Sequence, residues 1–213
     1  MNDNILNYIK QGVQFTDKSK VVIKGSLKCG KNVKIDINSI FEGDVVIGDN
    51  VDIQSNCIIK DSVINDNTVI RPFTSLSGSV VGQNCTIGPY ANLRKDSIIM
   101  NNVSIGNYVE IKNSRIGSGS RINHLSFVGD TIMMENVTIG AGTITCNHDG
   151  KKHNTTLIGK AAYIGSGCKL IAPIEIGSNA TIGSGSIITK DVPSDKLTVS
   201  RSKQVVIKNW SRK

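Results

Sequence analysis

Three basic side chains near the middle of the chain have the types and the spacing to bind and activate a small anionic substrate. Arg94 and Lys112 each follow an aliphatic residue directly, within similar short segments of the sequence. Two cations held side by side repel each other unless an anion lies between them, and a phosphate suits both the planar fork of arginine and the point charge of lysine. His124 could take a proton from an amine or a hydroxyl group. Without further information, all three could equally be solvated surface charges.

Glu110 and two further histidines complete the set of groups that could take part in chemistry. Glu110 precedes His124 in the chain and is a possible orienter of its ring. His148 and His153 lie in a polar segment, and three histidines in one protein can form a zinc site. Two of the three fall in a flexible polar insertion with no evident carboxylate to support them. We therefore expect no metal.

A six-residue repeat positions these side chains. Aliphatic residues recur at every sixth position from Ile23, and the fifth residue of each unit is small or aliphatic. Four units are one residue short, those that start at Ile59, Leu76, Ile111 and Val128, and all four share one phase of a three-unit period. The pattern therefore predicts an all-β fold, a parallel β-helix shaped as a three-sided prism, with about 18 residues per coil and about nine coils.

The period places the candidate residues on the sides of this prism. Arg94 and Lys112 occupy the second position of units on the same side of adjacent coils, so we expect them to project outward one above the other, about 5 Å apart. His124 falls on a different side, one coil from the pair. Glu110 is expected on the side of His124 in the preceding coil, although it has a different place in its unit.

Three segments depart from the repeat. The first residues, 1–12, read as a short helix with Ile5, Leu6 and Ile9 on one face. A polar and basic loop at 145–157 interrupts the prism, and a loop ejected from a regular solenoid is usually a binding element. The predicted organisation is an N-terminal helix and linker over 1–22, the β-helix over 23–193, and a basic C-terminal tail over 194–213.

The composition excludes several classes of protein. The net charge is +8, but aromatic residues make up only 4% and do not alternate with basic clusters, so we expect no nucleic acid partner. The five cysteines are widely spaced without a CxxC pair, which favours reduced thiols in a cytoplasmic protein. Cys57, Cys85 and Cys168 occupy the fifth repeat position and are interpreted as small buried hydrophobes. No apolar run is long enough for a signal peptide or a membrane span, so no membrane partner is expected.

Four motifs carry a resemblance to a known family: IGPYANLR, IGNYVEIKNSRIG, NHLSFVGD and IGAGTITCNHDG. They closely resemble the acetyltransferase domain of the bacterial bifunctional glucosamine-1-phosphate N-acetyltransferase/N-acetylglucosamine-1-phosphate uridyltransferases. The similarity extends from Gly12 to Trp210 and so covers nearly the whole chain. The period of the repeat does not give the hand of the coil. The resemblance implies a left-handed one.

The resemblance implies an enzyme that transfers acetyl from acetyl-CoA to the amine of glucosamine 1-phosphate, a step of UDP-N-acetylglucosamine biosynthesis. It also implies a homotrimer with active sites between subunits, and no metal. Matched motif by motif, it assigns the general base to His124, substrate contacts to Arg94, Lys112, Phe127, Thr138, Asn147 and His153, and acetyl-CoA contacts to Ala141, Asn147, His148, Ser166, Ser184 and Arg201.

Several positions depart from the family pattern. Phe127 replaces the usual Tyr, so a hydroxyl contact is lost while the ring remains, and the loop Lys of the family has its nearest counterpart in His153 or Lys152. Other departures are Thr138 for Asn, His148 for Tyr and Ser184 for Ala. Nothing before Ile23 could hold a nucleotide-binding domain, so we expect no uridyltransferase activity. Two alternatives stay open, an acyltransferase for another amino sugar and a trimeric sugar-phosphate scaffold that has lost catalysis.

Overall fold

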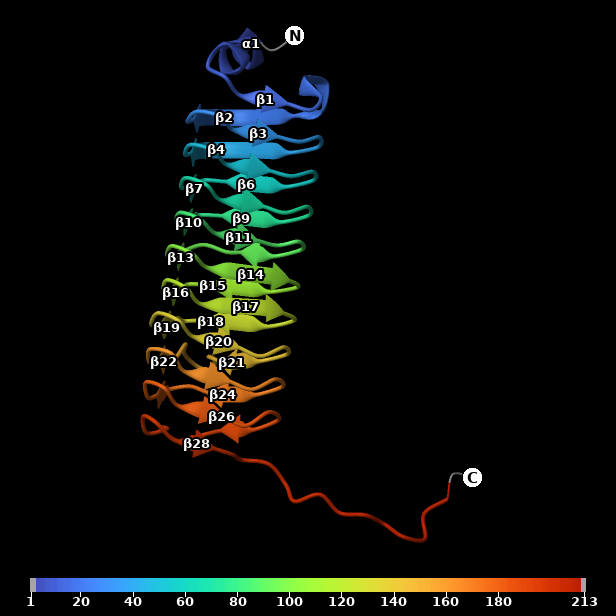
Figure 1. Ribbon diagram of the computed structural model, residues 1–213, viewed down its shortest axis with the longest axis vertical. Coiled ribbons are helices and arrows are strands. Elements are labelled where there is room, and N and C mark those ends of the chain that lie inside the picture. The colour runs from blue at the N-terminus through green and yellow to red at the C-terminus, as the bar shows by residue number, and fades with distance from the viewer. Residues whose placement is uncertain (1–2, 212–213) are drawn as a thin grey trace.

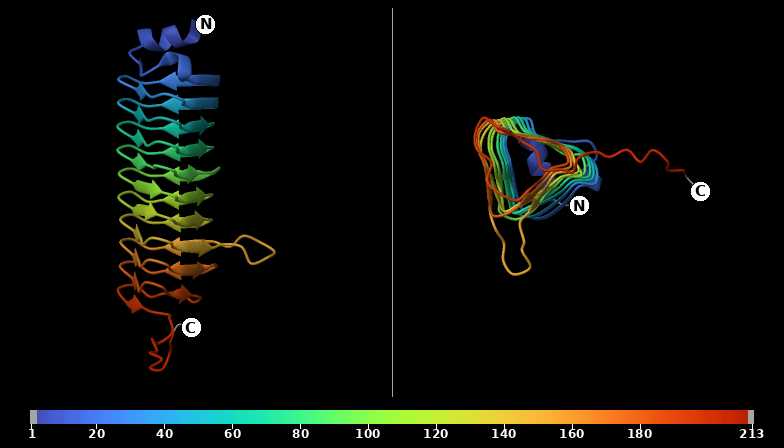
Figure 2. Two further views of the ribbon diagram at one scale, coloured as in Figure 1. Left: turned by 90° about the vertical axis from the view of Figure 1, so that its right-hand side faces the viewer. Right: turned by 90° about the horizontal axis from the view of Figure 1, so that it is seen from below.

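The computed structural model describes residues 3–211 and shows a rod of triangular cross-section built almost entirely from short parallel strands (Figures 1 and 2). Helix α1 (Asp3–Lys10) lies at one end, and one 3-10 turn, η1 (Lys18–Lys20), follows it. The predicted fold, a left-handed parallel β-helix of hexapeptide repeats, is confirmed. It has about ten turns instead of about nine, because β1 (Gln14–Phe15) and β28 (Leu197–Thr198) extend the stacking at both ends.

In every coil the chain passes over three faces in turn, and strands of successive coils pair in parallel. The first face consists of β1, β3 (Lys34–Ile35), β5 (Asp52–Ile53), β8 (Val69–Ile70), β11 (Thr86–Ile87), β14 (Ser104–Asn107), β17 (Arg121–His124), β20 (Thr138–Ile139), β23 (Tyr163–Ile164), β26 (Thr181–Ile182) and β28. The second face consists of β2 (Val22–Cys29), β4 (Ile40–Ile47), β6 (Ile58–Lys60), β9 (Ser75–Ser77), β12 (Asn92–Leu93), β15 (Glu110–Lys112), β18 (Phe127–Gly129), β21 (Ile144–Cys146), β24 (Lys169–Ile171) and β27 (Ile187–Ile188). The third face consists of the ends of β2 and β4 with β7 (Val63–Ile64), β10 (Ser79–Val81), β13 (Ser97–Ile99), β16 (Arg115–Ile116), β19 (Thr131–Met133), β22 (Thr156–Ile158) and β25 (Ile174–Ile176).

The pairing register confirms the three-unit period that the short units predicted. Leu93 pairs with Ile111 across a coil of full-length units, whereas Ile111 pairs with Val128 across a coil that contains a short unit. A short unit therefore removes one residue from a corner and leaves the next strand in register. This is why the same repeat position stays on the same face along the whole rod.

The aliphatic ladder fills the interior of the prism. Ile105 and Ile111 are completely buried, as are most members of the ladder, and they form one continuous cluster. Cys57, Cys85 and Cys168 are buried beside them and unpaired, which confirms their interpretation as small hydrophobes. Because neighbouring coils already satisfy each other's backbone groups, the interior needs only one layer of aliphatic side chains per coil.

Cys57 gives a prediction about alkaline stability. Burial raises the pKa of its thiol from 9.0 to about 11. The unfolded thiol loses its proton first as the pH rises, so the unfolded state binds fewer protons and the native state loses stability from pH 9 to pH 11. We expect this thiol to account for a loss of about 2–3 kcal/mol, measured by urea unfolding across that range. Cys57→Ala should lack this part of the loss; equal alkaline sensitivity in both proteins would contradict the assignment.

The corner between the first and second faces is marked by exposed side chains in the left-handed backbone region. Phe73, Tyr90 and Tyr108 all have φ values between 55° and 61°, and Leu125 continues the column with φ 50°. The rings of Phe73 and Tyr90 stack with centroids 4.9 Å apart, and those of Tyr90 and Tyr108 are 5.2 Å apart. Stacking between coils stabilises a backbone conformation that bulky residues otherwise avoid.

Helix α1 packs on the first coil in a way that differs from the prediction. Ile5 is buried and the Tyr8 hydroxyl donates a hydrogen bond of 2.9 Å to the carbonyl oxygen of Leu27. Leu6 and Ile9, expected on the same packing face, are 47% and 43% exposed. Among the helix side chains that the structure describes, Ile5 and Tyr8 are thus the ones that anchor it. The first two residues of the predicted helix lie outside the described residues.

Candidate active site

His124 lies at the end of strand β17 on the first face, directly before the corner. Its Nδ1 is 2.9 Å from Oδ1 of Asn107, the residue paired with it on strand β14. An amide oxygen can only accept a hydrogen bond, so Nδ1 carries the proton and donates it. The lone pair of the imidazole therefore resides on Nε2, on an exposed side chain. This is the tautomer that a general base requires.

The expected contact between Glu110 and His124 is wrong. Glu110 opens strand β15 on the second face, where it pairs in register with Phe127, and its Oε1 lies 2.7 Å from Nη1 of Arg94. The sixth position of a repeat unit already belongs to the next face, because the chain has turned the corner by then. Asn107, for which the sequence predicts no role, lies beside the ring of His124 instead.

Arg94 and Lys112 project from adjacent coils of the second face, as the repeat predicted. The pairing of Leu93 with Ile111 places the two basic residues in register, and the Arg94 amide nitrogen donates to the Ile111 carbonyl oxygen at 2.8 Å. Glu110 offsets part of their repulsion. The side chains of Arg94 and Glu110 are 49% and 37% exposed, so this ion pair contributes at most about 1 kcal/mol to folding. The guanidinium can therefore bind an external anion.

Phe127 lies on the coil above Lys112 and forms a half-buried wall of this surface. Gly129, which pairs with Lys112, is necessary for that arrangement. A side-chain carbon at position 129 would come within 2.7 Å of both the Phe127 ring and the Asn147 amide nitrogen. The missing side chain thus lets Phe127 and Asn147 approach each other over the backbone beside Lys112.

The ejected loop is a short hairpin that projects from the prism (Figure 2). It covers residues 147–155, not the predicted 145–157, because both flanking dipeptides are paired within strands β21 and β22. His148 and His153 form an antiparallel bridge across it. The Asp149 carboxylate accepts hydrogen bonds from the backbone amide of Lys152 and the side-chain amide of Asn154. These bonds hold the pKa of Asp149 below its usual range. The insertion is therefore closed on itself by its own hydrogen bonds.

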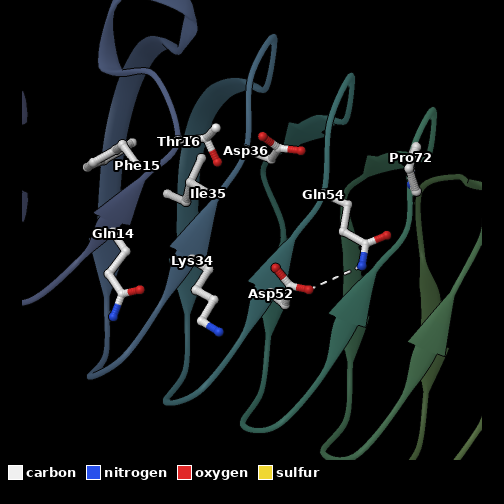
Figure 3. Close-up of a pocket in the computed structure, with 9 residues that line it drawn as sticks. All are labelled: Gln14, Phe15, Thr16, Lys34, Ile35, Asp36, Asp52, Gln54 and Pro72. Atoms are coloured by element: carbon white, nitrogen blue, oxygen red, sulfur yellow. Dashed lines mark hydrogen bonds between the residues drawn. The ribbon is translucent and has the colours of Figure 1, made fainter.

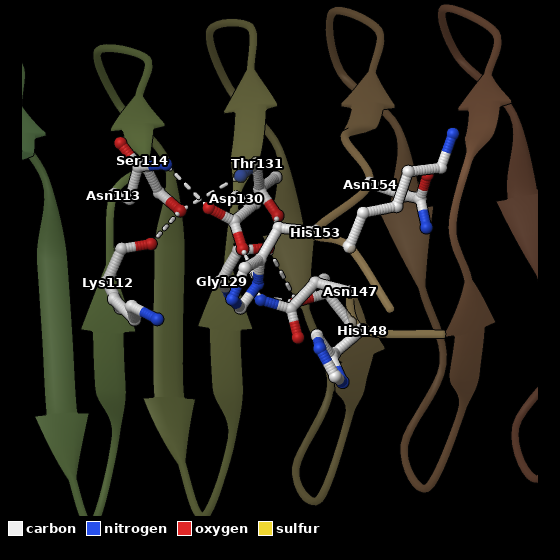
Figure 4. Close-up of polar contacts among 12 residues, drawn as sticks. Lys112, Asn113, Ser114, Gly129, Asp130, Thr131, Asn147, His148, His153 and Asn154 are labelled. Carbon is white, nitrogen blue, oxygen red and sulfur yellow. Dashed lines mark hydrogen bonds and ion pairs between the residues drawn. The ribbon is translucent and has the colours of Figure 1, made fainter. Parts of the chain in front are cut away.

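Asp130 joins this hairpin to the prism (Figure 4). Its Oδ1 accepts a hydrogen bond of 2.5 Å from the Asn113 amide, and its Oδ2 accepts one of 2.5 Å from the Asn147 amide. Nδ1 of His153 lies 2.9 Å from the same Oδ2. Partial burial would raise the pKa of Asp130, but the bonds from Asn113 and Asn147, with the charges of His153 and Lys112, keep that pKa below its ordinary value.

Four of the six residues assigned to acetyl-CoA line up along the rod from His124 toward the C-terminus, whereas Asn147 and His148 lie in the hairpin. The Gly142 amide donates to the His124 carbonyl, the Gly167 amide to that of Ala141, and the Gly185 amide to that of Ser166. A further bond joins the Arg201 guanidinium to the carbonyl oxygen of Ser184. Successive coils are about 4.8 Å apart, so this column is about 14 Å long from His124 to the coil of Ser184. The column consists of His124, Ala141, Ser166, Ser184 and Arg201.

The predicted residues fall into two groups that one chain does not bring together. His124 and Thr138 belong to the first face, whereas Arg94, Lys112, Phe127 and the hairpin belong to the second face and its far corner. Between them lies the corner residue Leu125, which is 62% exposed. A hollow of about 330 Å³ beside His124 is lined from the first face alone and also includes Arg71, Gly106 and Asn123.

Other features of the surface lie away from these residues. A hollow of about 530 Å³ near the N-terminal end of the first face contains Lys34, Asp36, Asp52 and Gln54, with Asp52 and Gln54 hydrogen-bonded at 3.1 Å (Figure 3). Within residues 3–211, no group of three or more His, Cys, Asp or Glu side chains is placed to hold a metal ion. Over the same residues, no helix has the length and apolarity needed to cross a membrane.

Comparison with known proteins places these features in context. A family model described as the GMPPB C-terminal domain matches residues 23–104, and one described as bacterial transferase hexapeptide (six repeats) matches residues 155–190. The chain is similar in fold to the UDP-N-acetylglucosamine acyltransferase from Campylobacter jejuni, with a TM-score of 0.63 and 18% identity, over 86% of this chain and 70% of that one.

Relatives with much higher identity are bacterial proteins of about twice the length. The chain is 54% identical over 202 residues to the bifunctional protein GlmU of Psychrobacter sp. (strain PRwf-1), which covers 95% of this chain and 44% of the relative. It is 47% identical over 204 residues to the bifunctional protein GlmU of Janthinobacterium sp. (strain Marseille), covering 96% of this chain and 45% of the relative. The chain thus spans about half the length of the curated relatives it matches.

Proposed function

We propose that the chain, which belongs with the C-terminal acetyltransferase domains of the bifunctional GlmU proteins, transfers acetyl from acetyl-CoA to the amine of glucosamine 1-phosphate. The product is N-acetylglucosamine 1-phosphate, formed in the bacterial cytoplasm. The observation that carries the proposal is the hydrogen bond of 2.9 Å between Nδ1 of His124 and Oδ1 of Asn107. It leaves Nε2 of an exposed histidine free to accept a proton at one end of the predicted acetyl-CoA column.

In the proposed reaction the amine nitrogen bonds to the thioester carbonyl carbon. His124 accepts at Nε2 the proton that the nitrogen loses. The carbon–sulfur bond then breaks, and the leaving thiolate takes that proton from Nε2 and departs as the thiol. Asn107 keeps the imidazole in the required tautomer through its amide oxygen. The chain's contribution is therefore positioning and one proton transfer, which together account for much of the acceleration in acyl transfer to an amine.

The column from His124 to Arg201 fits an extended co-substrate. It presents small side chains at Ala141, Ser166 and Ser184, so a long flexible ligand could lie against the backbone of successive coils. Arg201 at its end offers a guanidinium suited to a phosphate of acetyl-CoA. The acetyl group would then lie at the His124 end, where the amine must also arrive.

We propose that the site is completed between copies of the chain in a homotrimer. His124 and the pair Arg94–Lys112 occupy adjacent faces separated by the corner at Leu125. A ligand that touches both would have to cross that corner, whereas a second copy packed against it brings the first face of one chain to the second face of another. Sedimentation equilibrium should then give three times the chain mass, and a strictly monomeric active enzyme would refute the shared site.

The acceptor is tested by thiol release from acetyl-CoA with a panel of amines. We expect turnover with glucosamine 1-phosphate and a much higher KM for glucosamine, which lacks the phosphate. Preference for another phosphorylated or unphosphorylated amino sugar would favour the alternative acceptor. If acetyl-CoA and glucosamine 1-phosphate bind in calorimetry but no amine releases thiol, the protein is a binding scaffold.

Arg94 should determine affinity for the phosphate of the acceptor. Loss of a hydrogen bond to a charged group costs about 1.5–3 kcal/mol, so Arg94→Ala should raise KM for glucosamine 1-phosphate by about 10–150-fold. The KM for glucosamine should change little. Lys24→Ala is the matched control, because Lys24 forms a similar ion pair with Glu42 at 3.1 Å on the same face, far along the rod. An unchanged KM in Arg94→Ala would refute the phosphate assignment.

A further inference from the structure

Asp130 occupies a corner of the prism at which the chain leaves the second face for the third. Its φ of 48° lies in the left-handed region, and its side chain is only 9% exposed. A buried carboxylate is costly unless hydrogen bonds or a cation compensate for the lost water. The contacts of the Asp130 carboxylate therefore decide whether this corner forms as observed.

Those contacts connect three consecutive layers of the protein. Asn113 belongs to the coil below, and its amide binds one carboxylate oxygen. Asn147 is the first residue of the ejected hairpin, and His153 lies near its end. Both side chains bind Oδ2, the other carboxylate oxygen of Asp130. The backbone of Asp130 adds two bonds, from its own amide to the Lys112 carbonyl and from the Thr156 amide to its carbonyl. One side chain thus fixes both legs of the hairpin to the coil that carries Lys112.

The hairpin contact also sets the position of a predicted ligand-binding side chain. The Asn147 amide is directed onto Asp130 (Figure 4). The same amide nitrogen and the Phe127 ring both lie within 2.7 Å of the point that a side-chain carbon of residue 129 would occupy. If the carboxylate were absent, Asn147 would be free to rotate and the wall beside Lys112 would lose its shape. The His153 ring binds the same carboxylate in its own chain, so it helps to hold the base of the hairpin in place.

We propose that Asp130 is a positioning residue for acetyl transfer, which anchors the hairpin at residues 147–155 through Asn147 and His153 and thereby orders the substrate wall beside Lys112. The proposal rests on the proposed function for its catalytic consequence. The anchoring consists of contacts within the folded chain, so it can be measured without any enzymatic reaction. Asp130 is expected to act through Asn147 and to make no contact with the reacting atoms.

The anchor is tested by limited tryptic cleavage, because Lys151 and Lys152 lie at the exposed tip of the hairpin. Asp130→Asn keeps the size of the side chain but replaces one acceptor oxygen with a donor. We expect cleavage after Lys151 or Lys152 to become about tenfold faster or more, with the fragments identified by mass. Asp61→Asn is the matched control, since Asp61 lies at the same corner with a φ of 44° but binds no hairpin.

Two further variants separate anchoring from a general loss of stability. His153→Ala should accelerate the same cleavage, whereas His153→Gln, whose side-chain amide can still donate a hydrogen bond to the carboxylate and which adds no tryptic site, should restore protection. The combination of Asp130→Asn with His153→Ala should be less than additive, as expected for two members of one contact. Wild-type cleavage rates in Asp130→Asn, or strict additivity, would overturn the proposal. A melting temperature measured for each variant identifies any that fails to fold.

The kinetic readout distinguishes this inference from the proposed function. Asp130→Asn should weaken acetyl-CoA binding in calorimetry or raise the KM for glucosamine 1-phosphate about tenfold or more, with a smaller change in kcat. If the wild type releases no thiol with any amine yet Asp130→Asn opens the hairpin and weakens acetyl-CoA binding, the proposed function fails and the anchor stands. If the wild type is active and Asp130→Asn matches it in KM, binding and cleavage, the anchor fails alone.

Discussion

Replacing His124 with alanine is expected to lower kcat for acetyl transfer to glucosamine 1-phosphate by about 10²–10⁴-fold, the usual contribution of a general base. The KM values should change much less, because the substrate contacts are assigned to other side chains. The physical reason is the hydrogen bond of 2.9 Å from Nδ1 to Asn107, which directs the free lone pair of Nε2 outward. Thiol release under saturating substrates measures the effect.

Two controls make this result specific. His148→Ala removes another exposed histidine, one assigned to acetyl-CoA contact, and should raise the KM for acetyl-CoA while leaving kcat much closer to the wild-type value. Asn107→Ala should lie between the wild type and His124→Ala, because the imidazole remains but loses the partner that selects its tautomer. If His124→Ala turns over at the wild-type rate, another group removes the proton.

The second large effect concerns stability. Ile105 is completely buried and stacks between Ile87 and Ile122 on the first face. Removing most of a buried isoleucine side chain leaves a cavity, so Ile105→Ala should lower the free energy of unfolding by about 2–5 kcal/mol. The cavity cannot close easily, because backbone hydrogen bonds to the coils on both sides fix the spacing of the strands.

Urea unfolding followed by circular dichroism measures this change. The control is Leu6→Ala, since Leu6 is aliphatic but 47% exposed, and we expect a change within about 0.5 kcal/mol. A loss below about 1 kcal/mol for Ile105→Ala would show that the interior of the prism can collapse around a missing side chain, contrary to the close packing expected of a protein core.

The architecture could be predicted from the sequence because its signal is repeated many times. Each coil contributes the same aliphatic positions, and the short units at Ile111 and elsewhere reappear as shortened coils in the pairing register. The stacking of Arg94 on Lys112 follows directly from that register. An irregular unit is outweighed by the many regular ones. Both the fold and the stacked pair of Arg94 and Lys112 could therefore be predicted from the sequence.

Contacts between different positions of the repeat were much harder to predict. Glu110 was assigned to His124 from its place in the preceding coil, but the strand begins one residue before the inward position, so Glu110 lies on the next face. Asn107 could have been found, since it follows Ile105 at the same distance at which His124 follows Ile122. Asp130 could not, because its partners in the hairpin have no fixed place in the repeat.

The most direct test of the central claim is the identity of the product that the chain forms from acetyl-CoA and glucosamine 1-phosphate, determined by mass spectrometry and proton NMR. We expect N-acetylglucosamine 1-phosphate in an amount equal to the thiol released, and a greatly reduced yield from His124→Ala over the same time. Thiol release without acetylated sugar, or an equal yield from the alanine variant, would contradict it.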